Sequence, residues 1–498
     1  MKRLGLWLVG LCCATLLPAQ APDEAWRTIS TAHLRVHYPA ALDSLARRAA
    51  AEGEWAWSAL AASLVPPRGV IELVVTDHQD ISNGSATVFP TNRITVFARP
   101  PVDDVALRAG ADWLRFVITH EMAHVFHLDR SRGLWRVAQG IFGRHPALFP
   151  HLQSPRWLIE GIAMQYERLA GAGRLDGSQL PATLAVLDAS AHPLTPRTAS
   201  IATPRYPGGN SAYFAGARLV EAGIQAGGDS ALRRFIDDGA GRIIPFGWDR
   251  AARHAFGASF GALSERVVSG RAGPTASAPG DLAAIGPLWW EARGPRWRGD
   301  TIRFVATAPR EIPWVFDAVR GAVHPVTRRN SVDAHGQAGA HAVYADLDLT
   351  DPYRYRSHLL RGEERLRTPG LERAAAPDVR ADGAIVAMRG AAGTTELIIV
   401  ESDTVRVLAA GTPDLQWSAP RWSRAGDRVA AVRWRLGGET DIVVLDPQGR
   451  TLQVLGTTRA VQLHPSWGPE DRTLYFASDR DGVMAIHRAT IATGAIER

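Results

Sequence analysis

The sequence is nearly free of cysteine. Its two cysteines, Cys12 and Cys13, stand next to each other near the amino terminus, and no other cysteine follows. A disulfide within the rest of the chain is therefore excluded. A metal ion bound there would need nitrogen and oxygen ligands, because no thiolate is available.

Lysine is also scarce, and no basic stripe stands out. Lys2 is the only lysine, so nearly all of the 56 basic residues are arginines, against 50 acidic residues. The arginines are scattered among carboxylates, as in RRFIDDGAGR at residues 233–242. Nucleic acid is therefore not an expected partner, since its binding requires a concentrated basic surface.

Long apolar runs are missing except at the amino terminus. Lys2 and Arg3 precede an apolar stretch over residues 4–17, and small residues follow at Ala19 and Ala21. This pattern is typical of a secretory signal peptide over residues 1–21. It predicts a periplasmic or secreted protein with no stable membrane span in the mature chain. The alternatives are lipid attachment at one of the two cysteines and an uncleaved anchor formed by residues 4–17.

The chain divides into two parts with different patterns. With 498 residues it is too long for one ordinary core. Residues 22–270 mix strands with helices, which we expect at about 104–128, 155–169, 210–225, 229–238 and 248–268. A linker rich in Gly, Ala, Pro and Ser follows at 271–284, and short strands with glycine turns fill residues 285–498.

The second part repeats itself. Pro377, Pro420 and Pro465 start similar segments 43 and 45 residues apart, and GPLWW at 286–290 fits the same spacing more weakly. A period near 44 with about four short strands predicts the blades of a β-propeller, about five in number. A β-sandwich is the alternative. The phrases WSRAGD and ASDRDG resemble the WD40-like repeats of TolB-type propellers. Such propellers commonly have more blades, which would make the sequence a carboxy-terminally shortened piece.

The first part contains HEMAH at residues 120–124. On a helix, His120 and His124 share one face, where both imidazoles reach one metal ion, and Glu121 lies close enough to take a proton from a water on that metal. Zinc suits such a site. The alternative is a helix with two partly buried histidines and a solvated glutamate.

A third ligand distinguishes these interpretations. The metzincin pattern fails, since His127 and Arg130 occupy the positions that it reserves for Gly and His. A predicted helix from about residue 155, capped by Ser154, places Glu160 among its apolar residues. A buried carboxylate needs a cation, which is either the metal or a buried arginine.

These two segments together resemble the gluzincin zinc peptidases, and most of all the peptidase-MA-like domains that bacteria fuse to TolB-like propellers. The resemblance implies an α+β zincin-type metallopeptidase domain followed by an all-β propeller. It implies one Zn²⁺ ion held by His120, His124 and Glu160, with Glu121 as the general base. The gap between His124 and Glu160 is longer than in thermolysin, and the insert leaves three substitute ligands open, namely His127, His145 and His151.

Two further stretches match roles that the gluzincins assign. SNGSATVFPTNRITVF precedes the metal helix as a substrate-pairing edge strand would, which makes Asn83, Gly84 and Ala86 candidates for substrate binding. An ordinary turn and strand is the alternative. A tyrosine on a later helix stabilises the oxyanion in many gluzincins, and Tyr213 is the choice here, with Tyr206 behind it. A core aromatic is the alternative for Tyr213.

The sequence therefore predicts an exported zinc-dependent peptidase. Its partners would be a peptide or protein substrate and a protein partner on the propeller. One rival is a catalytically inactive binding or scaffold protein of the cell envelope, and another is a zinc hydrolase that acts on a non-peptide amide. A pull-down with the propeller alone, compared with the whole chain, separates the first rival from the peptidase, and a substrate screen separates the second.

Overall fold

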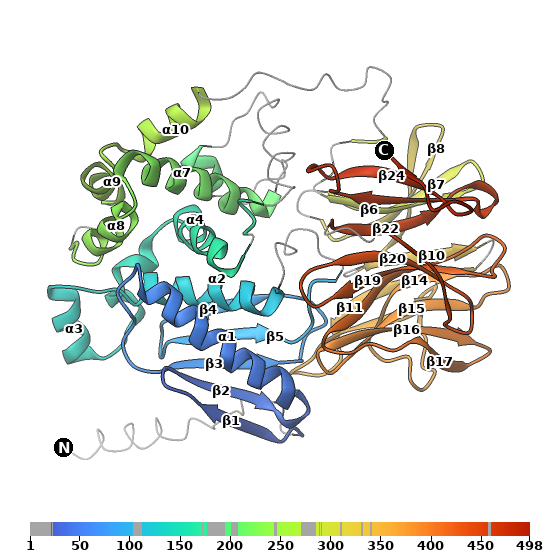
Figure 1. The fold of residues 1–498 in the computed structure, drawn as a ribbon, viewed down its shortest axis with the longest axis horizontal. Coiled ribbons are helices and arrows are strands. Elements are labelled where there is room, and N and C mark those ends of the chain that lie inside the picture. Colours follow the sequence, from blue (N-terminus) through green and yellow to red (C-terminus); the bar gives the residue numbers. More distant parts are fainter. Residues whose placement is uncertain are drawn as a thin grey trace, which may run out of the picture.

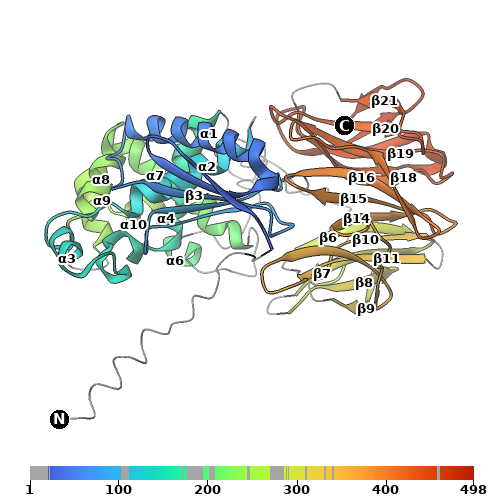
Figure 2. The same cartoon turned by 90° about the horizontal axis from the view of Figure 1, so that it is seen from below.

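The structure is a computed structural model with two parts side by side (Figures 1 and 2). It describes residues 21, 23–102, 112–171, 173–176, 195–200, 208–243, 247–269, 285–287, 289, 291–308, 311–329, 332–338, 341–456 and 460–498. The predicted signal peptide, except Ala21, and the predicted linker at 271–284 lie outside the described residues.

The first part contains a mixed five-stranded sheet in the order β1-β2-β3-β5-β4. Its strands are β1 (Trp26–Ser30), β2 (Leu34–Pro39), β3 (Ile71–Thr76), β4 (Gly84–Thr87) and β5 (Arg93–Phe97). The three central strands β2, β3 and β5 run parallel, whereas β1 and β4 are antiparallel edges. Side chains alternate between buried and solvent-facing along β2 and β3, so only one face of the sheet packs on the core.

The described helices of the first part pack on this sheet and on one another. They are α1 (Asp43–Ala61), α2 (Trp113–Leu128), α3 (Leu134–Phe142), α4 (Arg156–Glu167), α6 (Pro196–Ala199), α7 (Ser211–Gly227), α8 (Ala231–Gly239), α9 (Trp248–Phe256) and α10 (Phe260–Ser269). One continuous core joins the sheet, α1 and α2 to α4 and α7–α10. Among the described helices, none combines the length and the apolar character needed to traverse a bilayer.

Three helix predictions need correction. The helix expected at 248–268 is two helices, because Gly257 adopts the left-handed conformation that ends α9 (φ 75°). The insert between His124 and Glu160 contains α3, a helix that was not predicted. Ser154 does not cap α4; Pro155 occupies that position and its carbonyl accepts the first helical bonds, while the buried Ser154 hydroxyl has no hydrogen-bond partner among the described residues.

The second part is an all-β propeller, as predicted. Its described residues form five four-stranded antiparallel sheets in chain order. The blades are β6 (Glu291–Arg298), β7 (Thr301–Thr307), β8 (Trp314–Val319) and β9 (Ala322–Arg328); β10 (Val332–Ala338), β11 (His341–Leu349), β12 (Tyr355–Arg361) and β13 (Glu364–Arg365); β14 (Ala374–Val379), β15 (Ile385–Ala391), β16 (Thr394–Glu401) and β17 (Thr404–Ala409); β18 (Leu415–Trp422), β19 (Val429–Arg435), β20 (Thr440–Leu445) and β21 (Thr451–Leu455); β22 (Gln462–Trp467), β23 (Thr473–Ser478), β24 (Ala485–Thr490) and β25 (Ile496–Glu497).

The repeated proline marks a β-bulge in the first strand of a blade. Pro377, Pro420 and Pro465 each follow a residue with positive φ, at the point where the register of the first strand shifts. The first blade has the same feature at Gly294 and Pro295, within β6. The segment at 286–290, which was matched weakly to the repeat, therefore does not start the first blade, because it precedes β6.

The sheet of the first part meets the propeller at the ends of two parallel strands. Residues 77–80, which follow β3, contact the second and third blades, and residues 98–102, which follow β5, reach the third and fourth. Backbone bonds join the two parts as well, since Tyr355 N donates to His78 O and Asp80 N donates to Tyr355 O.

Candidate metal centre

Helix α2 carries the HEMAH residues into the middle of the first part. The Asp112 side chain caps it by accepting hydrogen bonds from the backbone nitrogens of Leu114 and Arg115. The helix packs between α1 and α4, and nearly all of its side chains are buried. His120 and His124 therefore project into a largely dry environment, where an imidazole needs a partner.

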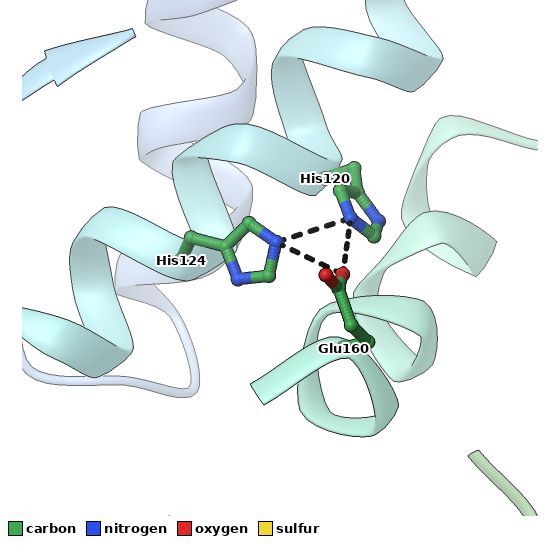
Figure 3. Close-up of side chains that lie close together, drawn as sticks. All are labelled: His120, His124 and Glu160. Atoms are coloured by element: carbon green, nitrogen blue, oxygen red, sulfur yellow. Dashed lines mark hydrogen bonds and ion pairs between the residues drawn. The ribbon is translucent and has the colours of Figure 1, made fainter. Parts of the chain in front are cut away.

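Three ligand atoms form a compact triangle (Figure 3). His120 Nε2 and His124 Nε2 are 3.1 Å apart, and each lies 3.4 Å from Glu160 Oε2. Zinc–nitrogen bonds of about 2.0–2.1 Å in a tetrahedral arrangement place ligand atoms about 3.3–3.4 Å apart. The spacing of the two imidazoles and the carboxylate therefore fits one zinc ion, and these residues form the one such cluster found among the described residues.

The electrostatics of the triangle favour a cation. Glu160 Oε2 is buried without a hydrogen-bond partner within the described structure. Burial disfavours a charged imidazole, but the neighbouring Glu160 and Glu167 carboxylates outweigh it and raise the pKa of His120 to about 9. Burial likewise opposes ionisation of Glu160, yet the two histidines hold the pKa of its carboxyl well below the usual range. The site thus attracts positive charge, which a divalent ion would supply.

A close crossing of α4 and α7 brings Glu160 and Tyr213 to the same place. Gly161 and Gly216 face each other at the crossing, and a Cβ on Gly216 would lie only 1.8 Å from the Trp157 carbonyl oxygen. The lack of side chains lets the two helices approach. Tyr213, one turn before Gly216, consequently lines the same cleft as Glu160, next to the ring of His120.

Glu121 lies in that cleft, beside the edge strand β4. The cleft has a volume of about 270 Å³, and Asn83, Gly84 and Ala86 all line it, as do the three candidate ligands. A Cβ on Gly84 would lie 2.9 Å from Glu121 Cγ and 2.6 Å from Val117 Cγ2, so only glycine allows this close approach. Burial raises the pKa of Glu121 above that of an ordinary glutamate, which improves its carboxylate as a base.

Glu167 orients His120 from behind. His120 Nδ1 donates to Glu167 Oε1 at 2.8 Å, which leaves Nε2 free to face the triangle. Arg174 pairs with the same carboxylate at 2.5 Å. Burial opposes ionisation of Glu167, but Arg174 and His120 outweigh it and lower the pKa of Glu167 to about 2. Sequence reasoning missed Glu167, although it stands seven residues after Glu160, on the same helical face.

We expect Glu167→Gln to weaken zinc binding by about 10–100-fold, because the charged partner of the His120 ring is lost. Competition with a chromophoric chelator measures this affinity. Glu221→Gln is the control, since Glu221 pairs with Arg168 near the surface of α7. This variant should bind zinc as the parent does. Unchanged affinity in Glu167→Gln would mean that packing alone positions the ring.

Two arginines surround Tyr213. The Arg174 guanidinium lies 4.6 Å and that of Arg156 5.5 Å from the centre of its ring. Burial, together with the Glu160 carboxylate, raises the pKa of the Tyr213 hydroxyl, so it keeps its proton at neutral pH. The tyrosine is therefore available as a hydrogen-bond donor. Tyr206, the second choice, lies outside the described residues.

The three histidines considered as substitute ligands lie elsewhere. His127 and His151 are buried against each other, with Nε2 of His127 3.2 Å from Nδ1 of His151. His145 is exposed, and its side chain accepts a bond from the backbone nitrogen of Ala147. None of the three joins the triangle formed by His120, His124 and Glu160.

Comparisons with known proteins bear on the fold alone. No protein-family model matches the chain, and no curated protein does. Similar solved structures include TolB from Acinetobacter baumannii, with 13% identity and a TM-score of 0.35, over 41% of this chain and 53% of that chain. A putative TolB from Agrobacterium tumefaciens shows 13% identity and a TM-score of 0.35, over 42% and 79%. A puromycin-hydrolyzing peptidase from Mycobacterium tuberculosis shows 17% identity and a TM-score of 0.30, over 42% of this chain and 37% of that chain.

The chain thus spans about half the length of the Acinetobacter structure that it matches. The propeller is defined by its own five sheets.

Proposed function

We propose that the chain is a zinc-dependent peptidase that works outside the cytoplasm. The main support is one juxtaposition: two imidazoles and a carboxylate at tetrahedral spacing, with a buried second carboxylate beside them in a cleft edged by a β-strand. The arrangement resembles the ligand set of catalytic zinc sites, in which three protein ligands leave one position open.

Each residue then has a role in hydrolysis. His120, His124 and Glu160 would hold the ion, which when bound would polarise the scissile carbonyl and make a water acidic. Glu121 accepts the proton of the attacking water and returns it to the departing amine. Tyr213, which stays protonated, donates a hydrogen bond to the oxyanion.

Strand β4 would align the substrate. It is an edge of the sheet, paired on one side with β5, and its residues Gly84, Ser85 and Ala86 line the cleft. An extended peptide added to the free side would place successive side chains alternately toward the cleft and away from it. This favours an unfolded peptide or an extended loop of a protein as substrate.

The propeller would bind a partner or deliver the substrate. Its five blades offer a large surface, but the fold itself specifies no ligand. The proposed location, periplasmic or secreted, rests on the amino-terminal pattern around residues 4–17.

Cleavage of a quenched fluorescent peptide library by the purified protein tests the proposal. We expect hydrolysis that a strong chelator abolishes and that stoichiometric zinc restores. The chelated protein without added metal is the matched control. A protein that contains one zinc ion and cleaves no peptide would instead favour the scaffold interpretation, or a hydrolase for a non-peptide amide.

A further inference from the structure

Helix α3 is amphipathic in the reverse sense of an ordinary surface helix. A surface helix usually turns its apolar stripe to the core and its polar residues to water. In α3 the apolar residues Leu134, Val137, Ile141 and Phe142 are 63%, 58%, 70% and 72% exposed, while the polar Gln139 is only 6% exposed. We call these four exposed residues the α3 face.

Polar contacts hold the helix in this orientation. The Gln139 side chain accepts a bond from Arg68 Nη2 at 2.6 Å and donates to the Leu148 carbonyl at 2.8 Å. On the same side, the Trp135 indole donates to the Arg242 carbonyl. Rotating the helix to bury its apolar residues would break these bonds, so exposure of the α3 face is built into the fold.

The stretch of chain that contains the α3 face carries positive charge only. Residues 130–159 contain five arginines and no carboxylate, unlike the mixed charges of the rest of the chain. Arg130 and Arg144 are neutralised by Asp237 and Asp129. Arg132 and Arg136, both exposed, have no ion-pair partner among the described residues, and they flank the start of the helix.

We propose that α3 binds the surface of an anionic phospholipid membrane, with the α3 face among the lipid chains and Arg132 and Arg136 at the phosphates. Exposed apolar residues beside unpaired cations are the pattern of interfacial helices. A second copy of the chain is a poorer partner for the α3 face. Packing two α3 faces together would bring the arginines of both copies close, and residues 130–159 offer no carboxylate to offset their repulsion.

The position of α3 allows such docking. Figures 1 and 2 place it at the end of the molecule opposite the propeller, so contact with a bilayer leaves the propeller free. The helix follows α2 after five residues, and the Arg144 guanidinium donates to the Val88 carbonyl beyond β4. Membrane binding would thus hold the cleft near the lipid surface. The inference needs no catalytic activity and stands apart from the proposed function.

Flotation of the purified full-length protein with phospholipid vesicles tests this inference. We expect binding to vesicles of phosphatidylcholine with phosphatidylglycerol, and weaker binding to phosphatidylcholine alone. The double variant Ile141→Asn, Phe142→Asn should bind at least about tenfold more weakly, because two apolar side chains are lost from the interface. Arg132→Gln and Arg136→Gln should each cost about fivefold, and added salt should reduce this difference.

Leu452→Asn is the matched control, because Leu452 is a 51% exposed leucine on the propeller strand β21. It should bind vesicles as the parent does, and equal thermal midpoints should show that all variants fold. Vesicle binding that the double variant retains in full would overturn the inference. Self-association without lipid that the double variant abolishes would also overturn it, in favour of a second copy as occupant.

Discussion

Replacing Glu121 with glutamine is expected to leave zinc bound and to lower peptide hydrolysis by about 10²–10⁴-fold. Glutamine has almost the shape of glutamate, so the contact with Gly84 is preserved. It has no basic carboxylate, however, and so accepts no proton from the attacking water. The three ligand residues are untouched, because Glu121 contributes no atom to the triangle.

The measurement pairs steady-state cleavage of the fluorescent peptide with the metal content of the same sample. Glu160→Gln provides the contrast, since it removes a charged ligand and should lose zinc and turnover together. A Glu121→Gln protein that binds zinc and cleaves at the parent rate would remove Glu121 from the mechanism. One that loses zinc would instead indicate that Glu121 helps to hold the site together.

Local spacing explains why the three candidate ligands could be predicted to lie together. His120 and His124 are one helical turn apart, so their proximity follows from the helix alone. The prediction for Glu160 required one more step, namely that Glu160 lies on the same face of its helix as the apolar residues Trp157 and Met164. Both of these residues are buried in the structure. Glu121 and the edge strand lie together because β4, the last strand of the sheet, packs against α2.

The sequence was less informative where contacts depend on tertiary packing. Arg174 reaches His120 from a turn beyond α4, and no spacing rule connects these two residues. Helix α3 shows apolar periodicity, but periodicity does not say which face meets the core, and here the contacts of Gln139 reverse the usual rule. The propeller was predictable because its bulge recurs with proline, yet the first blade was misaligned, since its bulge uses Gly294 before the proline.

The contact between the two parts was not foreseen at all, because its residues are almost 300 positions apart in the chain. Arg373 of the propeller makes a bidentate pair with Asp77, with distances of 2.7 and 2.9 Å, and a further bond to Asp80. Arg356 adds a second bond to Asp80, at 3.0 Å. Asp80 is almost fully buried, so the cluster is a dry ion network across the interface.

We expect Arg373→Met to destabilise the protein by about 3–5 kcal/mol, because it leaves two buried carboxylates with too little positive charge. Methionine keeps much of the aliphatic volume, so the cost comes from the charge and not from a cavity. The loss should fall on the interface, and urea unfolding followed by tryptophan fluorescence should change from one transition to two, as the parts unfold separately.

Arg488→Met is the control, since Arg488 forms an exposed ion pair with Glu497 on the last blade. Its substitution should leave the unfolding curve unchanged. If Arg373→Met also unfolded like the parent, the ion network would contribute nothing. The apolar contacts of Val102 with Met388 and Trp434 would then have to hold the two parts together. Because residues 98–102 follow β5, next to the cleft strand β4, a loosened interface should also raise KM while zinc stays bound, which links the propeller to substrate alignment.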